Sequence, residues 1–288
     1  STVKGRPEGT ILAFNSIWEN ADKPQEIEHL IAMDCATFSE DTELHELVKE
    51  YQSFYKQLGI KILVHEVCFC KRPEQYEFRN LHREYWNPLA KVAKGDIIFG
   101  LTNDCVIQTK GFDTILFDAF EEHKEKHKHD VVQFLIDDDS ASTKSQFRPS
   151  AALKSDTWKS GKIDKLQALK ESQDKATSDF CQWVILSKSA VDIIGGIIPD
   201  EIQLEGGDTY VDSIFKNTIL PSQLDLTSQI ITEDNSHHTG KSDEDQQTLG
   251  QGRPVMDKRA EIETLFIDSK RPYDAKINLE IVKQAYSL

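Results

Sequence analysis

Carboxylates follow three apolar runs of the sequence, and these acidic side chains are the residues best placed to do chemistry. Asp34 follows Leu-Ile-Ala-Met, Asp104 comes shortly after the run 97–101, and residues 137–139, all Asp, follow the run 131–136. Because the carboxyl ends of parallel strands meet at the ligand-binding edge of an open α/β sheet, we expect these side chains to lie close together. Their oxygens suit Mg²⁺ or Mn²⁺, which often share ligands with phosphates. Taken singly, each Asp is equally suited to capping the next helix or turn.

An alternation of strands and helices must position these carboxylates. Apolar residues at helical spacing predict helices over 8–21, 42–58, 78–93, 111–126, 190–194, 208–215, 256–267 and 275–286. Apolar runs predict strands over 28–33, 60–67, 97–101, 131–136 and 180–186. This order predicts an α/β fold with a largely parallel sheet covered by helices on both faces. The sequence has neither a dinucleotide-binding glycine motif after a strand nor a P-loop, which disfavours classical NAD binding and P-loop hydrolysis.

The connecting segments carry weaker signals. Residues 1–7 and the polar stretch 219–252 are predicted as loops, and Gly59 is expected to end its helix in the left-handed conformation. His123 and His127 are spaced by four residues near the end of a predicted helix. They could hold a metal, but a positively charged final helix turn is the favoured interpretation.

The composition excludes some classes of function. The 288 residues include 34 Lys and Arg against 49 Asp and Glu, a net charge of −15, which argues against binding a nucleic-acid backbone. No apolar run approaches the ~18 residues of a transmembrane helix, so no transmembrane segment is expected. No secretory leader is visible and the five cysteines are scattered and odd in number. We therefore expect a reduced, cytoplasmic protein.

Several sequence fragments, taken in order, form a family signature over roughly residues 1–215. Ser-Thr-Val-Lys-Gly-Arg-Pro at 1–7 is followed by the run ending at Asp34 and by the spacing Asn87-x5-Ala-x-Gly-Asp-x-Ile. That spacing leads into Thr-Asn-Asp104, and Glu-Gly-Gly-Asp208 follows later. Together they resemble the nucleotide-sugar-dependent glycosyltransferases of GT-A fold, closest to the inverting family 2.

The resemblance implies a fold and an activity. It implies a GT-A, Rossmann-like core over 1–220, with a mostly parallel central sheet. Residues 221–288 would add a polar C-terminal extension, a lid loop and helices that pack on the same domain. The implied activity is transfer of a hexosyl or pentosyl group from a nucleoside diphosphate sugar, with UDP favoured, to an acceptor hydroxyl with help from Mn²⁺ or Mg²⁺. The acceptor and the donor sugar cannot be identified from the sequence.

The resemblance also implies roles for individual residues. Asp104 would bind the metal together with a histidine from the C-terminal loop. His238 is the preferred candidate for that histidine, and His237 is the next. Asp208 would be the catalytic base that takes the proton from the acceptor. Asp34 and Arg6 would contact the base and ribose of the donor. The remaining residues expected to bind the nucleotide sugar are Thr2, Arg83 (or Arg79 in its place), Asn87, Asn103, Asp104 and Gly207.

The chain departs from the family pattern at four places. Thr102 stands where the metal motif has its first Asp, Trp86 stands where Arg usually precedes Asn87, and Gly207 replaces a Glu. The sequence also starts in the loop that would follow the first strand, so that central strand is expected to be missing. Two alternatives therefore stay open: a sugar nucleotidyltransferase, which shares the fold and the metal, and an inactive nucleotide-sugar-binding protein.

Overall fold

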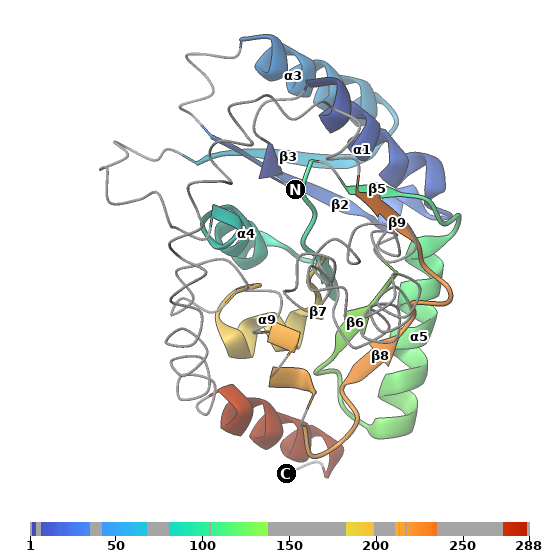
Figure 1. The fold of residues 1–288 in the computed structure, drawn as a ribbon, viewed down its shortest axis with the longest axis vertical. Helices are drawn as coiled ribbons and strands as arrows, with labels where there is room; N and C mark the ends of the chain where they lie inside the picture. The colour runs from blue at the N-terminus through green and yellow to red at the C-terminus, as the bar shows by residue number, and fades with distance from the viewer. Residues whose placement is uncertain are drawn as a thin grey trace, which may run out of the picture.

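The chain folds as a mixed α/β protein in the computed structural model shown in Figure 1. The structure describes residues 2–3, 7–34, 42–67, 81–103, 105–137, 183–198, 211–212, 214–216, 218–234 and 273–286. The strands in this part of the chain form three small sheets and no barrel. The sequence predicted one largely parallel sheet. Apolar runs mark strands but not their direction, which here differs from sheet to sheet.

The first sheet is fully parallel. Its strands are β1 (Thr2–Val3), β2 (Glu28–Asp34) and β3 (Lys61–Val67), in the order β1-β2-β3. The prediction that residues 1–7 form only a loop, with no first strand, was therefore wrong for Thr2–Val3, which pairs with Ala32 and Met33. Two residues carry too little pattern to be recognised as a strand.

Helices cover both faces of this sheet (Figure 1). On one face lie α1 (Pro7–Asn20) and α3 (Thr42–Gln57), and on the other lies α4 (Leu81–Val92). Alternate residues of β2 divide between them: Ile31 and Met33 pack with the first two helices, whereas Leu30 and Ala32 pack against α4. This burial on both faces explains why β2 has consecutive apolar residues from Leu30 to Met33.

The first face is organised around a buried hydroxyl. The indole nitrogen of Trp18 donates to the Tyr51 hydroxyl at 2.5 Å, and His29 Nδ1 lies 3.1 Å from the same oxygen. These contacts tie α1, α3 and β2 together. The C-terminal end of α3 is also as predicted, because Gly59 follows it with φ of 77°.

The second sheet is mixed. It contains β4 (Ile97–Phe99), β7 (Ile185–Ser187), β6 (Gln133–Leu135) and β8 (Gln223–Asp225), in the order β4-β7-β6-β8. Strand β7 is antiparallel to both neighbours, and β6 is parallel to β8. The strands expected at 97–101, 131–136 and 180–186 are thus present but shorter, and β8 was not predicted.

The remaining helices pack on two hydrophobic cores, and two further strands form a third sheet. Helix α5 (Phe112–His127) packs on the core of the first sheet, while α9 (Lys188–Ile194) and helix 273–285 belong to a second core with Trp86 and Ile98. The third sheet pairs β5 (Cys105–Ile107) with β9 (Thr232–Asp234) in antiparallel fashion, and neither strand was predicted. Among the described residues, no helix is both long and apolar enough to span a bilayer. The expected helix 256–267 lies outside the described residues.

Candidate active site at the strand ends

The ends of several strands lie close to the first turns of α1. Strand β1 ends next to the last residues of β2, and α1 begins four residues after β1. The side-chain nitrogen of Asn103, which lies just beyond β4, donates to the Thr10 hydroxyl of α1 at 3.0 Å. Thr10 is fully buried and Thr102 is 8% exposed. The end of β4 and the start of α1 are therefore joined at this edge, where open α/β sheets bind ligands.

Strand β5 is fastened to α1 on the same side. The backbone amide of Ile107 donates to the Ser16 hydroxyl at 2.9 Å, and Asn20 donates to the Ile107 carbonyl at 2.7 Å. Both bonds involve buried or half-buried groups. They hold the segment that follows position 104 in a defined place.

The partner of β5 is a segment distant in the sequence. Cys105 lies opposite Asp234, and Ile107 lies opposite Thr232. The side chains of Gln108 and Glu233 add a hydrogen bond of 2.7 Å across the pair. Because the strands are antiparallel, the start of β5 and the end of β9 are at the same end of this small sheet. The sequence had no signal for this pairing.

Asn87 has a precise structural environment. It is 5% exposed, and its Oδ1 accepts hydrogen bonds from the amides of Ile197 and Ile198 at 2.9 and 3.1 Å. Its Nδ2 donates to the Ile198 carbonyl at 2.7 Å. The carboxamide thus joins α4 to the segment that follows α9. A contact between Asn87 and a nucleotide sugar stays a prediction.

The other predicted site residues are described only in part. Thr2 lies in β1, Asp34 ends β2 and Arg83 lies in the first turn of α4; their side chains are not described. The predicted residues outside the described part of the chain are Arg6, Arg79, Asp104, Gly207, Asp208, His237 and His238. Within the described residues, no group of three or more His, Cys, Asp or Glu is arranged to hold a metal ion.

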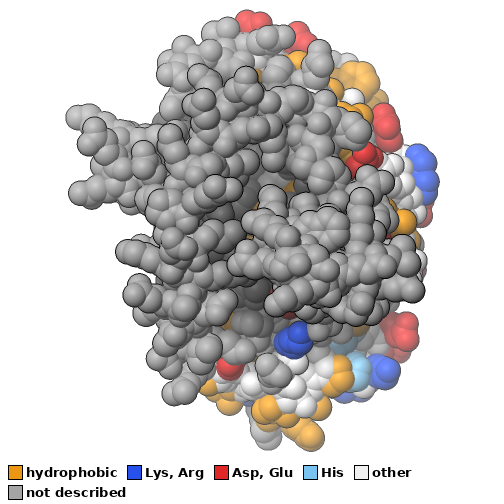
Figure 2. All heavy atoms as spheres, viewed as in Figure 1, with side chains coloured by type: hydrophobic (Ala, Val, Ile, Leu, Met, Phe, Trp, Pro, Cys, Tyr) orange, Lys and Arg blue, Asp and Glu red, His pale blue; other side chains and the backbone are white. Residues whose placement is uncertain are grey.

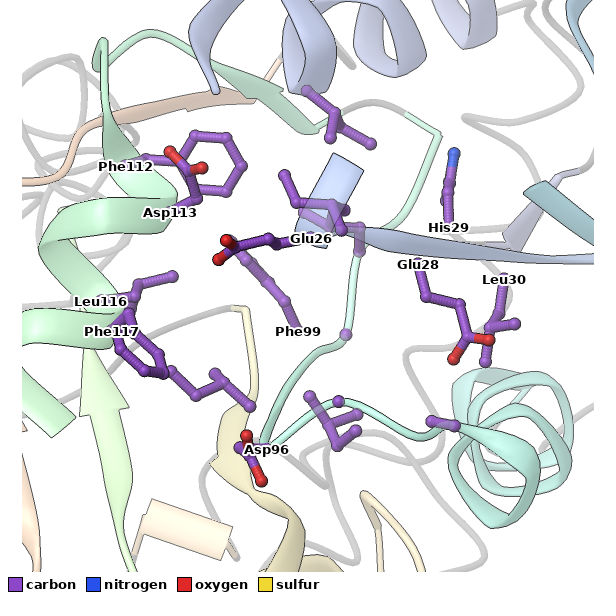
Figure 3. A pocket seen from close by; sticks show the side chains of 18 of the residues that line it. Glu26, Glu28, His29, Leu30, Asp96, Phe99, Phe112, Asp113, Leu116 and Phe117 are labelled. Atoms are coloured by element: carbon purple, nitrogen blue, oxygen red, sulfur yellow. The ribbon is translucent and has the colours of Figure 1, made fainter. Parts of the chain in front are cut away.

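A second feature, not predicted from the sequence, is a cavity of about 370 Å³ between the start of β2 and the segment around β4. Figure 3 shows Leu116 and Phe117 of α5 on the opposite side of this cavity from Leu30 of β2. The cavity lies along the first residues of β2, Glu28 to Leu30, whereas Asp34 is at the other end of the strand. Its lining also includes Leu101 and Ile107, so the cavity borders the strand-end site at β5, but Asp34 does not line it.

Two acidic side chains that line this cavity, Asp113 and Glu28, accept hydrogen bonds from backbone amides of loops. The Asp113 carboxylate accepts the backbone amides of Asp22 and Lys23 at 2.9 and 2.8 Å. Glu28 accepts the amide of Lys94 at 3.1 Å. Away from the cavity, Figure 2 shows that acidic and basic side chains of the described residues are scattered along the edge of the surface in that view.

Three histidine rings gather at the end of α5. The ring centre of His123 lies 4.7 Å from that of His127 and 4.7 Å from that of His129. Burial, together with a smaller effect of the neighbouring positive charges, lowers the pKa of His123 to about 4. Burial also lowers the pKa of His129, and that of His29 within the first core. The side chains of His29, His123 and His129 are therefore neutral near pH 7.

Comparison of the chain with protein-family models, with curated proteins and with solved structures finds no match. The class of the protein must therefore be inferred from its residues and their placement.

Proposed function

We propose that the protein is a GT-A-type glycosyltransferase that moves a sugar from a nucleoside diphosphate sugar to an acceptor hydroxyl, with inversion and with a divalent metal. The observation that carries the proposal is the antiparallel pairing of β5 with β9, in which Cys105 faces Asp234. It supplies a physical reason for two distant sequence segments to serve one site.

The pairing brings the attachment points of the proposed metal ligands together. Asp104 directly precedes Cys105, and His238 follows Asp234 by four residues. Four extended residues reach at most about 14 Å, so a loop from the end of β9 can return to the start of β5. A carboxylate oxygen and an imidazole nitrogen form a suitable ligand pair for Mn²⁺. When bound, the metal would neutralise the charge that develops on the diphosphate leaving group.

The described groups at this edge suit a nucleotide donor. Asn103 is held in place by Thr10, and the amino end of α1 lies at the same edge. The first amides of a helix have no partners within the helix and attract phosphate oxygens. Together with Asp34 at the end of β2, these groups would orient the donor beside Asp104.

The segment that carries the proposed base is anchored on both sides. Asn87 holds the backbone of Ile197 and Ile198 ahead of Asp208. After it, Val211 is fully buried and Ile214 is 1% exposed, both in the second core. A base must be positioned within hydrogen-bonding reach of the acceptor, and these two anchors support such a role.

In the proposed reaction, Asp208 takes the proton of the acceptor hydroxyl as its oxygen attacks the anomeric carbon. The new carbon–oxygen bond forms on one face of the sugar while the bond to the diphosphate breaks on the other. The nucleoside diphosphate leaves, and the anomeric configuration is inverted.

The experiment is a turnover assay with a panel of nucleoside diphosphate sugars, with Mn²⁺ and with EDTA. The proposal expects metal-dependent release of nucleoside diphosphate from at least one donor, by slow hydrolysis or by transfer to added acceptors. Release of pyrophosphate would instead identify a nucleotidyltransferase. Donor binding with no turnover for any acceptor would identify an inactive binding protein.

A further inference from the structure

Helix 273–285 is held on the second core by its inner face. Gln284 Oε1 accepts the backbone amide of Asp130 at 2.9 Å, which ties the helix to the segment after α5. Figure 1 shows the helix in red at the lower end of the molecule, and Figure 2 shows exposed hydrophobic side chains at the same end. The side chains that bury the inner face are 6%, 0% and 0% exposed; they are Tyr273, Ile277 and Ile281.

The outer face of the same helix carries a line of apolar residues. Leu279 and Tyr286 are 56% and 68% exposed, Ala275 is exposed and Val282 is half-buried. They follow one another at intervals of four, three and four residues. The amide of Tyr286 donates to the Val282 carbonyl at 3.1 Å, which keeps Tyr286 in line with the helix. Single exposed apolar residues are ordinary on a protein surface, whereas four in one line form a contact surface.

The spacing of this line is that of the a and d positions of a coiled coil. Residues at alternating intervals of four and three lie on one narrow stripe, from which they insert into a neighbouring helix. A helix that lies in a membrane interface instead has a large apolar face that sinks among the lipids. The narrow stripe therefore favours a second helix, rather than a bilayer, as its occupant.

The charges beside the stripe indicate the chemistry of that second helix. With Leu279 and Tyr286 at a positions, the e positions are occupied by Lys276 and Lys283. Side chains at e flank the contact in a coiled coil and pair with charges on the partner. Both lysines are exposed. Lys283 Nζ lies 3.7 Å from a Glu280 oxygen, but an exposed pair of this kind is weak and leaves the ammonium available to a partner.

Two copies of this helix are poorly matched to each other. In an antiparallel pair e positions face e positions, so lysine would face lysine, which is repulsive. In a parallel pair e faces g, and the g positions hold Asn278 and Ala285, neither of which can form an ion pair. A helix with Glu or Asp at its own flanking positions would instead pair with both lysines.

We propose that the seam formed by Ala275, Leu279, Val282 and Tyr286 binds an acidic amphipathic helix of a partner protein as a two-stranded coiled coil. The partner helix would pack its own apolar a and d residues on the seam and place carboxylates beside the two flanking lysines. This is recognition of a helix by anchors at intervals of three, four and seven residues. None of the seam residues belongs to the set assigned to donor, metal or acceptor.

The test measures the affinity of two synthetic peptides by titration calorimetry at about 0.15 M salt. Each peptide has about three heptads with Leu at a and d. The acidic peptide has Glu at every e and g position, and the basic peptide has Lys there. The proposal expects the acidic peptide to bind at least about tenfold more tightly. Since the protein carries a net charge of −15, its overall field favours the basic peptide, so this preference can only arise locally.

A variant of the seam tests the apolar contact. Leu279→Ser should weaken binding of the acidic peptide at least about tenfold, because it removes a central a residue. Leu58→Ser, at a position 54% exposed just after α3, is the matched control and should leave the affinity unchanged. Circular dichroism verifies that both proteins are folded.

A charge reversal tests the flanking lysines. The double variant Lys276→Glu and Lys283→Glu should reverse the preference, so that the basic peptide binds more tightly. The control double variant Lys49→Glu and Lys56→Glu makes the same change at exposed positions of α3 with the same spacing of seven residues. It should retain the preference for the acidic peptide.

Equal affinity for the two peptides, or binding of the acidic peptide that Leu279→Ser does not weaken, would overturn the proposal. So would self-association in sedimentation velocity that Leu279→Ser abolishes, because the seam would then hold a second copy. Binding to phosphatidylglycerol vesicles that the same variant abolishes would assign the face to a bilayer and equally overturn it. None of these readouts involves turnover, so their failure leaves the proposed transferase activity untouched.

Discussion

Cys105 and Asp234 lie opposite each other in the antiparallel pair of β5 and β9. This contact joins the segment after the expected metal-binding Asp104 to the segment before the two neighbouring histidines. Strand β5 is in turn bonded to α1 through Ser16 and Asn20. These contacts connect α1, β5 and β9, and the proposed metal ligands directly precede β5 and follow β9 in the sequence.

Asn87 and Gly196 form a tight contact that predicts a coupled effect on stability. A Cβ added to Gly196 would lie 2.3 to 2.5 Å from the carboxamide atoms of Asn87. Asn87→Ala leaves the buried backbone groups of 197 and 198 without partners, and we expect a loss of about 2–4 kcal/mol in the free energy of unfolding. Gly196→Ala should cost about 1–3 kcal/mol through overpacking.

In the double variant, the Ala at 196 no longer meets the carboxamide, so its cost should be smaller than in the wild-type background. Urea unfolding of all four proteins measures this coupling. Gly95→Ala is the control, because its new Cβ would make only an ordinary contact of 3.5 Å with the Ile97 carbonyl. Strictly additive losses would show that Asn87 and Gly196 do not share this contact.

The buried histidines predict loss of stability in mild acid. The pKa values of His29, His123 and His129 are lowered in the folded protein, so below about pH 6.5 the unfolded chain binds more protons. Stability is therefore retained above pH 6.5 and lost as the pH falls toward 4. Tm measured from pH 7.5 to 4.5 should decrease, and His123→Leu should decrease less. An NMR titration midpoint near 6.5 for the His123 ring would contradict this account.

Asp208→Asn predicts a selective loss of turnover. The amide keeps the shape of the side chain but cannot accept the proton, and loss of a general base typically lowers kcat by about 10²–10⁴. Donor affinity should stay nearly constant, since the interaction is made in the transition state. Asp192→Asn, at an exposed position of α9, is the control. Near-normal kcat in Asp208→Asn, or a product with retained configuration, would return Asp208 to a structural role.

Comparison of His238→Ala with His237→Ala assigns the second metal ligand. The proposal expects His238→Ala to weaken Mn²⁺-dependent nucleotide affinity by at least about tenfold, since a direct ligand is removed. His237→Ala should change it little. The reverse order would assign the role to His237, and no effect of either variant would remove the C-terminal histidines from the site.

The long helices could be predicted from the sequence because their apolar residues recur with the helical period. Helix α3 follows this pattern, and Gly59 ends it in the left-handed conformation, as the lack of a Cβ allows. The parallel strands β2 and β3 were found for a similar reason, since both are long and apolar enough to stand out.

The strands that shape the candidate site could not be predicted. Strand β9 consists of Thr232, Glu233 and Asp234, and three polar residues carry no alternation. Its pairing follows from tertiary contacts with β5, a strand that is itself bonded to Ser16 and Asn20 of α1. The same holds for Asn87: the spacing singled it out, but its bonds to Ile197 and Ile198 depend on the folded arrangement of α4 and α9.

The central claim is that Asp104 binds a metal that holds a nucleoside diphosphate. Titration calorimetry with UDP, with and without Mn²⁺, tests it on the wild type, Asp104→Ala and the exposed control Asp118→Ala, with circular dichroism to verify folding. We predict Mn²⁺-dependent binding for the wild type and Asp118→Ala, and loss of the metal-dependent affinity in Asp104→Ala. Unchanged Mn²⁺-dependent affinity in a folded Asp104→Ala protein would contradict the claim.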